Sequence, residues 1–546
     1  MRIAITATMA LLMTGQSLGQ ATDVSDLAGH GREIALTQQG AVRGRTIGAV
    51  TEFLGLPFAA PPVGDLRWKA PASPARWNGV RDATLPAGLC VQPGTDANAQ
   101  RVIVGSEDCL YLNVYRPSRA ATGLLPVMIF VHGGSNIRQD ASSYDPSALV
   151  EQNGIIVVTV NYRLNVFGFL ALPSLDAEAG DTSSGNYGLL DQQAAMRWVR
   201  SNILRFGGDP ADITVAGESS GAIDLCASLV SPAAAGLFRK AILESMYCPV
   251  APHTEALTVS APVARKLSCT DERTQASCMR AIPAAQVLTA AQPLSFVVGG
   301  GMGFNSSPNF GNRLLPLDPA AALASGSWNH ARILIGSNHD EGALFVAAGL
   351  LKLPPLPQGT YFPPPDIIYG ALVNRRFGSL APQVDAQYPL EDFDGNTFLA
   401  YADEVTDPSP LGCELSQWSD AFATTTTTFR YEFNEAAPAA PKGMNIPNNF
   451  PIGAYHGSEL QFLFDTTIEP GPRGPAQQKL SRDMIRYWGN FVKTGNPNGP
   501  GLLPWPRYEP RGRQILSLDS GGNSVITNFD DDHRCAFWTA HPSPGP

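Results

Sequence analysis

The sequence predicts an α/β protein with a large, mostly parallel central sheet and helices on both of its faces. Short apolar runs rich in β-branched residues at 126–131, 155–160 and 212–216 have the composition of strands that are buried on both faces. An amphipathic helical pattern at 192–206 lies between the second and third of these runs. This alternation of strand and helix is typical of a parallel sheet that is covered on both sides.

The first half of the chain begins with a hairpin pattern. Residues 33–45 alternate around Gln39-Gly40, as expected of a hairpin that opens a sheet. In the helical segment, Ala195, Val199 and Ile203 recur at four-residue spacing, and residues 207–210 (Gly-Gly-Asp-Pro) are expected to end the helix. The strand at 212–216 then follows at once.

The second half continues the pattern and adds two irregular regions. Further buried strands are expected at 240–244 and 331–336. Residues 250–330 and 345–450 are less regular, and we expect loops and helices laid over the sheet, not a separate domain. Near the end of the chain, a single helical stripe of core residues is predicted, formed by Leu480, Met484, Trp488 and Phe491.

The N-terminus has the pattern of a secretory signal peptide. Met1-Arg2 supplies a positive start, residues 3–13 are mostly apolar, and Ser17, Gly19 and Ala21 offer small residues for cleavage. We therefore expect residues 1–21 to be a signal peptide, residues 22–546 to form a single domain, and the protein to be secreted or periplasmic. In an oxidising compartment the eight cysteines can pair.

Composition excludes several classes of function. The 546 residues contain 38 Lys+Arg against 48 Asp+Glu, and no basic cluster follows a phosphate backbone, so we expect no nucleic-acid partner. The sequence contains no run of 18 apolar residues, the length needed to span a membrane. Without a C-x-x-C pair or an H-E-x-x-H stretch, we expect no metal site. The sequence carries no signal for an oligomeric state.

A candidate nucleophile follows the strand at 212–216. The pentapeptide Gly-Glu-Ser-Ser-Gly at 217–221 stands between that strand and an apolar helical segment at 222–230. A serine on a sharp strand-to-helix turn needs nearly side-chain-free positions two residues before and after it. Gly217 and Gly221 meet that need, and Ser219 is therefore the predicted nucleophile.

A nucleophilic serine also needs a base and an acid, which in this architecture follow it in the order acid, then histidine. The strand at 331–336 ends in a loop with two carboxylates, Asp340 and Glu341, and physical reasoning alone leaves the choice between them open. The candidate base is His456, in a loop with small neighbours. It is one of six histidines after Ser219, the others being His253, His330, His339, His533 and His541.

Several segments together resemble the type-B carboxylesterase/cholinesterase family of the α/β-hydrolase superfamily. The resemblance runs from about residue 33 to 540 and is densest from 105 to 245. It rests on residues 107–115 (Glu-Asp-Cys-Leu-Tyr-Leu-Asn-Val-Tyr), 161–163 (Asn-Tyr-Arg), 167–170 (Phe-Gly-Phe-Leu), 185–193 (Gly-Asn-Tyr-Gly-Leu-Leu-Asp-Gln-Gln), 206–210 (Phe-Gly-Gly-Asp-Pro) and 217–222. It implies an α/β-hydrolase fold, with long insertions of loops and helices that cover the active site.

By this resemblance, Ser219 is the nucleophile, Glu341 the acid and His456 the base of a catalytic domain that needs no cofactor. The family also implies that Glu218 and Ser245 support this triad through hydrogen bonds. The oxyanion hole would be formed by backbone N–H groups of Gly134, Ser135 and Ser220. The family usually has a third glycine and then an aromatic residue where this chain has Ser135 and Asn136.

The resemblance also implies a set of disulfides, namely Cys90–Cys109, Cys269–Cys278 and Cys413–Cys535. Cys226 and Cys248 remain after this assignment. Cys226 lies in the helix after the nucleophile, and Cys248 follows a neighbouring strand. We expect them to be free thiols, with a fourth bridge as the alternative.

The implied function is that of a carboxylesterase, a serine hydrolase that cleaves small to medium carboxylic esters through an acyl-enzyme. Residues 91–108 contain no aromatic residue to face a quaternary ammonium, which disfavours choline esters. A lipase and a thioester or amide hydrolase of the same fold are alternatives. A different class, a non-catalytic cholinesterase-like binding protein, is disfavoured because all three triad positions are filled.

Overall fold

The structure is a computed structural model that describes residues 33–96, 100–245, 248, 250–295, 304–347, 366–409, 411–442, 452–468 and 470–542. The predicted signal peptide at 1–21 lies outside these residues. Among the helices within them, none combines the length and the apolar character that crossing a membrane requires.

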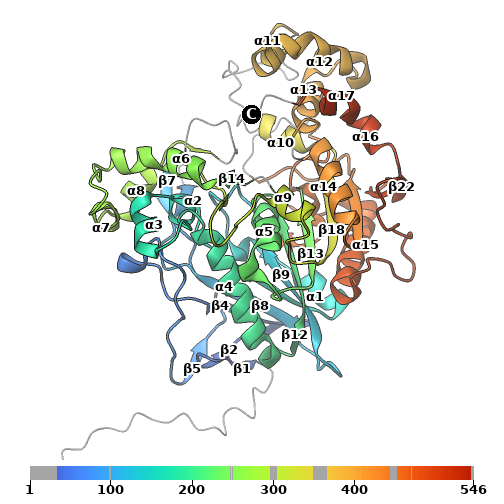
Figure 1. Cartoon of the computed structure of the whole chain (residues 1–546). Helices are drawn as coiled ribbons and strands as arrows, with labels where there is room; N and C mark the ends of the chain where they lie inside the picture. The colour runs from blue at the N-terminus through green and yellow to red at the C-terminus, as the bar shows by residue number, and fades with distance from the viewer. Residues whose placement is uncertain are drawn as a thin grey trace, which may run out of the picture.

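An eleven-stranded sheet forms the centre of the fold (Figure 1), as expected of an α/β-hydrolase. Its strand order is β22-β21-β19-β18-β13-β12-β9-β11-β8-β4-β3. Pairing is parallel from β21 to β11 and antiparallel at both edges. The strands are β3 (Arg45–Ile47), β4 (Val50–Pro57), β8 (Tyr111–Pro117), β9 (Leu125–Val131), β11 (Ile156–Val160), β12 (Gly208–Glu218), β13 (Lys240–Glu244), β18 (Arg332–Asn338), β19 (Thr428–Phe433), β21 (Ile515–Leu518) and β22 (Ser524–Ile526).

Alternate residues of the central strands pack into two different cores, one on each face of the sheet. In β9, Val127, Ile129 and Val131 join one core, and Met128 and Phe130 join the other. The first core includes residues of α4 (Tyr187–Asn202) and α5 (Ser220–Val230), and the second includes residues of α1 (Ser147–Asn153) and α15 (Gly474–Thr494). The predicted stripe of α15 is core: Leu480, Met484, Trp488 and Phe491 all belong to the second cluster.

Two predictions about strands need correction. Residues 33–45 do form a hairpin of β1 (Ile34–Leu36) and β2 (Ala41–Arg43), but it pairs with β5 (Val80–Asp82) in a separate small sheet. Within the irregular region 345–450, β19 belongs to the central sheet. Its apolar signal is interrupted by Arg430 and Glu432, which are buried despite their charge.

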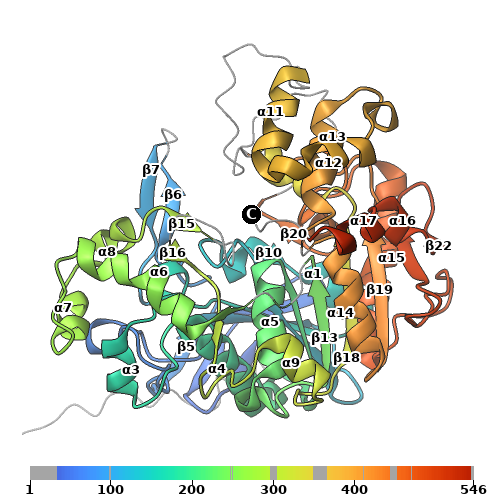
Figure 2. The same cartoon turned by 45° about the horizontal axis from the view of Figure 1, so that its top comes forward.

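The irregular regions otherwise contain helices that stand over the sheet, as predicted. Figure 2 shows two groups at the end of the sheet where the parallel strands terminate. One group consists of α6 (His253–Lys266), α7 (Gln275–Arg280) and α8 (Ala284–Ala290); the other of α11 (Asp366–Phe377), α12 (Ala381–Gln387) and α13 (Thr397–Thr406). A hairpin of β6 (Gln92–Thr95) and β7 (Arg101–Val104) stands beside the first group.

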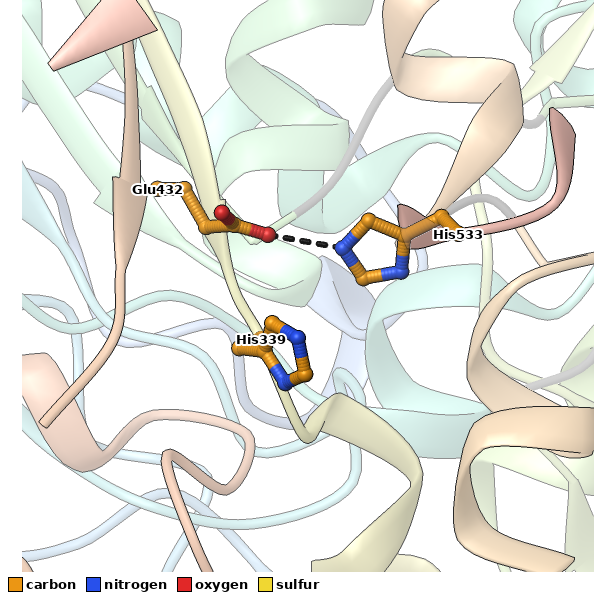
Figure 3. Close-up of side chains that lie close together, drawn as sticks. All are labelled: His339, Glu432 and His533. Atoms are coloured by element: carbon orange, nitrogen blue, oxygen red, sulfur yellow. Dashed lines mark hydrogen bonds and ion pairs between the residues drawn. The ribbon is translucent and has the colours of Figure 1, made fainter. Parts of the chain in front are cut away.

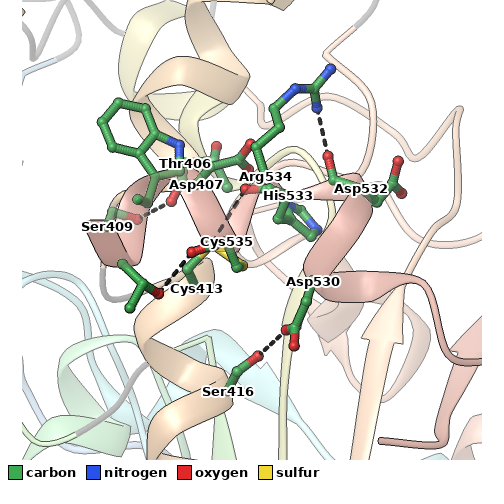
Figure 4. The surroundings of a disulfide bond; sticks show 12 residues. Thr406, Asp407, Ser409, Cys413, Ser416, Asp530, Asp532, His533, Arg534 and Cys535 are labelled. Carbon is green, nitrogen blue, oxygen red and sulfur yellow. Dashed lines mark hydrogen bonds and ion pairs between the residues drawn. A yellow bond between two sulfur atoms is a disulfide. The ribbon is translucent and has the colours of Figure 1, made fainter. Parts of the chain in front are cut away.

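Four disulfides are present. Cys90–Cys109, Cys269–Cys278 and Cys413–Cys535 pair as the family resemblance implied. The last of these joins α14 (Cys413–Ala423) to α17 (Cys535–Ala540) near the end of the chain (Figure 4).

The expectation of free thiols at Cys226 and Cys248 was wrong, because these two residues form the fourth disulfide. Cys226 lies in α5, which packs on β13, and the chain that leaves β13 brings Cys248 back to within a Cα–Cα distance of 5.3 Å of Cys226. Four disulfides indicate a protein that folds in an oxidising compartment and not in the cytoplasm.

Protein purified from an oxidising compartment should therefore show no titratable thiol when it is denatured without reductant. Full reduction should expose eight thiols, the number of cysteines in the chain. The measurement is a thiol titration with a chromogenic disulfide, combined with mass spectrometry of unreduced peptides. A pair of titratable thiols in peptides that contain Cys226 and Cys248 would contradict the fourth bridge.

Candidate active site

Ser219 lies on a sharp turn between β12 and α5, as the sequence predicted. Its backbone has φ 54° and ψ −127°, a conformation that non-glycine residues rarely adopt, and its N–H donates to the carbonyl oxygen of Glu244 at 2.9 Å. A Cβ at Gly221 would lie 2.2 Å from the carbonyl oxygen of Val131, and one at Gly217 would lie 2.8 Å from the backbone of Gly221. Gly221 is therefore required for close packing of the turn against β9, and Gly217 for the close approach of β12 to the start of α5.

The structure brings the predicted acid, base and nucleophile together. The imidazole of His456 has Nε2 at 2.9 Å from Oγ of Ser219 and Nδ1 at 2.6 Å from Oε2 of Glu341. The other carboxylate oxygen of Glu341 accepts a hydrogen bond from the backbone N–H of Asn338 at 2.8 Å. All three predicted side chains are buried, and Glu341 is fully so.

Asp340, the other carboxylate that physical reasoning left as a candidate, has different partners. Its Oδ2 accepts a hydrogen bond from the backbone N–H of Ala454 at 2.7 Å, and its Oδ1 lies 3.2 Å from Nδ1 of His339. The N–H of Asp340 in turn donates to the carbonyl oxygen of Ala454 at 3.1 Å. Asp340 thus links the loop that carries Glu341 to the loop that carries His456.

Carboxylates dominate the electrostatics around His456. Burial alone lowers its pKa, but the charges of Glu218 and Glu341, with a smaller contribution from Glu459, raise it to about 9. Oε1 of Glu218 lies 3.3 Å from Nε2 of His456. An imidazolium formed at this position would therefore be stabilised by the surrounding negative charge.

Glu459 and Asn338 belong to this site but were missed by sequence reasoning. Glu459 accepts a hydrogen bond from Oγ of Ser245 at 3.2 Å and another from the side-chain amide of Asn338. Burial, followed by the charge of Glu341, raises the pKa of Glu459 to about 7. Ser245 therefore contacts Glu459, and the signal that was overlooked is the position of Glu459 three residues after His456.

The loop after β9 packs directly against the Ser219 turn. A Cβ at Gly133 would lie 2.6 Å from Oε2 of Glu218 and 2.9 Å from Cβ of Ser219, so only glycine fits there. The next three residues, Gly134, Ser135 and Asn136, all have positive φ, at 91°, 63° and 54°. The N–H of Asn136 donates to Oγ of Ser220 at 2.9 Å, which brings the predicted oxyanion loop to the start of α5.

A group of side chains outside this site has the composition of a metal site. In the described part of the chain, ligand atoms of His339, Glu432 and His533 lie within 4.8 Å of one another (Figure 3). His533 has Nε2 at 2.7 Å from Glu432 and Nδ1 at 2.5 Å from Asp407. Burial lowers the pKa of His533, but these two carboxylates raise it to about 10. Because both ring nitrogens bind carboxylates, we interpret the group as an ion-pair network.

The fold and the site together define the class of protein. A serine on a strand–turn–helix corner of a mostly parallel sheet, with an acid and a histidine following in that order, is the arrangement of an α/β-hydrolase. The sequence model of the carboxylesterase family matches residues 32–538. The chain therefore belongs to the carboxylesterase family, and it is a carboxylic ester hydrolase.

Individual relatives agree with this assignment. A fumonisin B1 esterase of Sphingopyxis macrogoltabida is 36% identical over 537 residues, which cover 95% of this chain and 91% of the relative. A para-nitrobenzyl esterase of Bacillus subtilis is 33% identical over 501 residues, which cover 89% and 95%. A solved structure of a PNB esterase superposes with a TM-score of 0.74 at 32% identity, covering 92% of this chain and 99% of that one.

The ion-pair network gives a stability prediction with a defined pH dependence. Removing the cation in His533→Gln leaves the buried carboxylates of Asp407 and Glu432 without the cation between them, which should lower the free energy of unfolding by about 3–5 kcal/mol at pH 6. The folded pKa of about 10 lies above the usual value of about 6.5. The contribution of His533 is therefore complete below about pH 6.5 and is lost as the pH rises toward 10.

Denaturant unfolding of both proteins at pH 6 and pH 10 measures this effect, and the difference between wild type and His533→Gln should shrink at the higher pH. Treatment with EDTA should leave the wild-type unfolding midpoint unchanged. A large decrease after EDTA would show that the cluster binds a metal ion and would contradict the ion-pair interpretation.

Proposed function

We propose that Ser219, His456 and Glu341 are the catalytic triad of this hydrolase and that the reaction passes through an acyl-enzyme. The observation that carries the proposal is the continuous pair of contacts from Oγ of Ser219 through the imidazole of His456 to the carboxylate of Glu341. In this arrangement the histidine can accept the serine proton, and Glu341 orients the ring and stabilises the imidazolium.

In the proposed reaction, His456 removes the proton of Ser219 as Oγ attacks the carbonyl carbon of the ester. Backbone N–H groups of Gly134, Ser135 and Ser220 bind the oxyanion of the tetrahedral intermediate. The intermediate collapses, and the alcohol leaves with the proton from His456. Water, deprotonated by the same histidine, then attacks the acyl-enzyme, and the carboxylic acid leaves as Ser219 recovers its proton.

The proposed substrates are small to medium carboxylic esters. The names of two relatives, a fumonisin B1 esterase and a para-nitrobenzyl esterase, support ester substrates outside the choline class. The segment 91–108, which forms the β6–β7 hairpin, contains no aromatic side chain to bind a quaternary ammonium. We propose export on the basis of the N-terminal sequence pattern, together with the four disulfides.

The first test is hydrolysis of a series of p-nitrophenyl esters from acetate to palmitate. Wild type should hydrolyse the short members best, and Ser219→Ala should reduce kcat by at least about 10³-fold because the nucleophile is gone. A fluorophosphonate should add to Ser219 with a stoichiometry of one and abolish turnover. Full activity in Ser219→Ala would contradict the proposal, and a preference for palmitate would indicate a lipase.

The second test compares two neighbouring carboxylates. Glu341→Gln should lower kcat by about 10⁴-fold, because an amide cannot stabilise the imidazolium or hold the same ring tautomer. Asp340→Asn should cost less than about tenfold, since the asparagine oxygen can still accept the hydrogen bond of Ala454. Steady-state kinetics on one short ester measures both variants. The reverse order of effects would reassign the acid to Asp340.

A further inference from the structure

We propose that Asn136 and Asp224 are positioning residues that hold the oxyanion loop against the nucleophile helix, in place of the glycine and aromatic pair usual in the family. The proposal rests on the proposed function, since it concerns the loop that binds the oxyanion.

Asn136 is fully buried, and each polar group that it offers toward α5 has a partner there. Its backbone N–H donates to Oγ of Ser220 at 2.9 Å, and its side-chain Nδ2 donates to Oδ1 of Asp224 at 3.1 Å. Its Oδ1 accepts from the hydroxyl of Tyr162 at 2.8 Å. That hydroxyl also lies 2.9 Å from the carbonyl oxygen of His132, so it braces the start of the same loop.

The loop needs such bracing because its backbone is strained. Ser135 and Asn136 are consecutive non-glycine residues with positive φ, a conformation that is unfavourable for residues with a Cβ atom. Asparagine tolerates this region better than most residues, and serine has no such advantage. The hydrogen bonds of Asn136 therefore stabilise a conformation that a third glycine would adopt without strain.

Asp224 completes the network from within α5, one turn after Ser220. It is fully buried and accepts hydrogen bonds from Asn136 and from the side-chain amide of Gln192 on α4. Burial raises the pKa of Asp224 to about 7, although both hydrogen bonds oppose the shift. A buried carboxylate is costly, and here its two bonds join the oxyanion loop to two helices of the same core.

The consequence for catalysis concerns geometry. Oxyanion donors contribute only when their N–H groups point at the position that the developing charge will occupy. The N–H groups of Ser135 and Ser220 belong to the two segments that the Asn136 bonds join. Loss of the network should therefore weaken binding of the transition state and leave binding of the ground-state ester nearly unchanged.

The experiment uses the full-length protein, a short p-nitrophenyl ester and an alkyl trifluoromethyl ketone, which forms a tetrahedral adduct with the serine. Asn136→Ala should lower kcat by about 10–100-fold and leave KM within about twofold of wild type. Binding of the trifluoromethyl ketone should weaken by a factor similar to the loss of kcat. The control is Asn202→Ala. Asn202 is also buried and bonds to Gln38 and Trp198 at the opposite end of α4, so its replacement should lower stability without changing kcat.

Variants of Asp224 separate positioning from a general structural role. Asp224→Leu removes the acceptor and should reproduce the kinetic loss of Asn136→Ala, and the double variant should lose no more than either single one. Asp224→Asn, by contrast, should retain most of the wild-type activity. Its oxygen can accept from Asn136, and its new amide can donate to Oε1 of Gln192 after the Gln192 amide rotates, since this buried atom has no hydrogen-bond partner among the described residues.

The outcomes are decisive even if Asn136→Ala does not fold, because Asp224→Leu and Asp224→Asn then carry the comparison. A folded Asn136→Ala with kcat within twofold of wild type would overturn the proposal. So would an Asp224→Asn variant as impaired as Asp224→Leu, or a loss confined to KM. Failure of the proposed function itself would look different, since wild type would then show no turnover that Ser219→Ala removes.

Discussion

The site depends on how four parallel strands are aligned with one another in the sheet. Val131 of β9 pairs with Gly217 of β12, Gly217 with Leu243 of β13, and Leu243 with Ile335 of β18. β9, β12 and β13 therefore end within one residue of this row, β18 continues to Asn338, and the segments that follow all start at the carboxyl edge of the sheet. The proposed oxyanion loop, the Ser219 turn and the segment that leads to Glu341 are three of these segments. A slip of one residue in any strand would move its loop along the strand axis, out of line with its neighbours, and reverse which side chains face each core.

The second constraint is electrostatic. Glu218, Glu341 and Glu459 are all buried around one imidazole, an arrangement that would be costly unless positive charge developed there. Hydrogen bonds from Ser245 and Asn338 hold Glu459, and Asn338 also holds Glu341, so the donors keep the carboxylates apart in fixed positions. The negative charge is thus organised before any substrate binds, which is the form of preorganisation that lowers the cost of forming an imidazolium.

The sequence predicted the five strands at the centre of the sheet, β9, β11, β12, β13 and β18, because they are apolar runs, and their ends match the structure to within a few residues. It failed at β19, because the buried charged residues Arg430 and Glu432 give this strand the composition of an exposed strand. The contacts of Ser219 with His456 join residues 237 positions apart, and the proposal of that pair came from chain order and family resemblance, not from local pattern. Asp224 carried no local signal, because its importance lies in partners that only the folded chain brings near.

The double link of Asp340 to Ala454 has a consequence for how the molecule opens. One bond runs from the carboxylate and one from the backbone N–H, so the segment after β18 and the segment before His456 share two hydrogen bonds. Neither segment can separate from the sheet edge without breaking both. Amide hydrogens in the two segments should then exchange with solvent in a common opening event, and Glu341 and His456 would leave and return together as one cooperative unit.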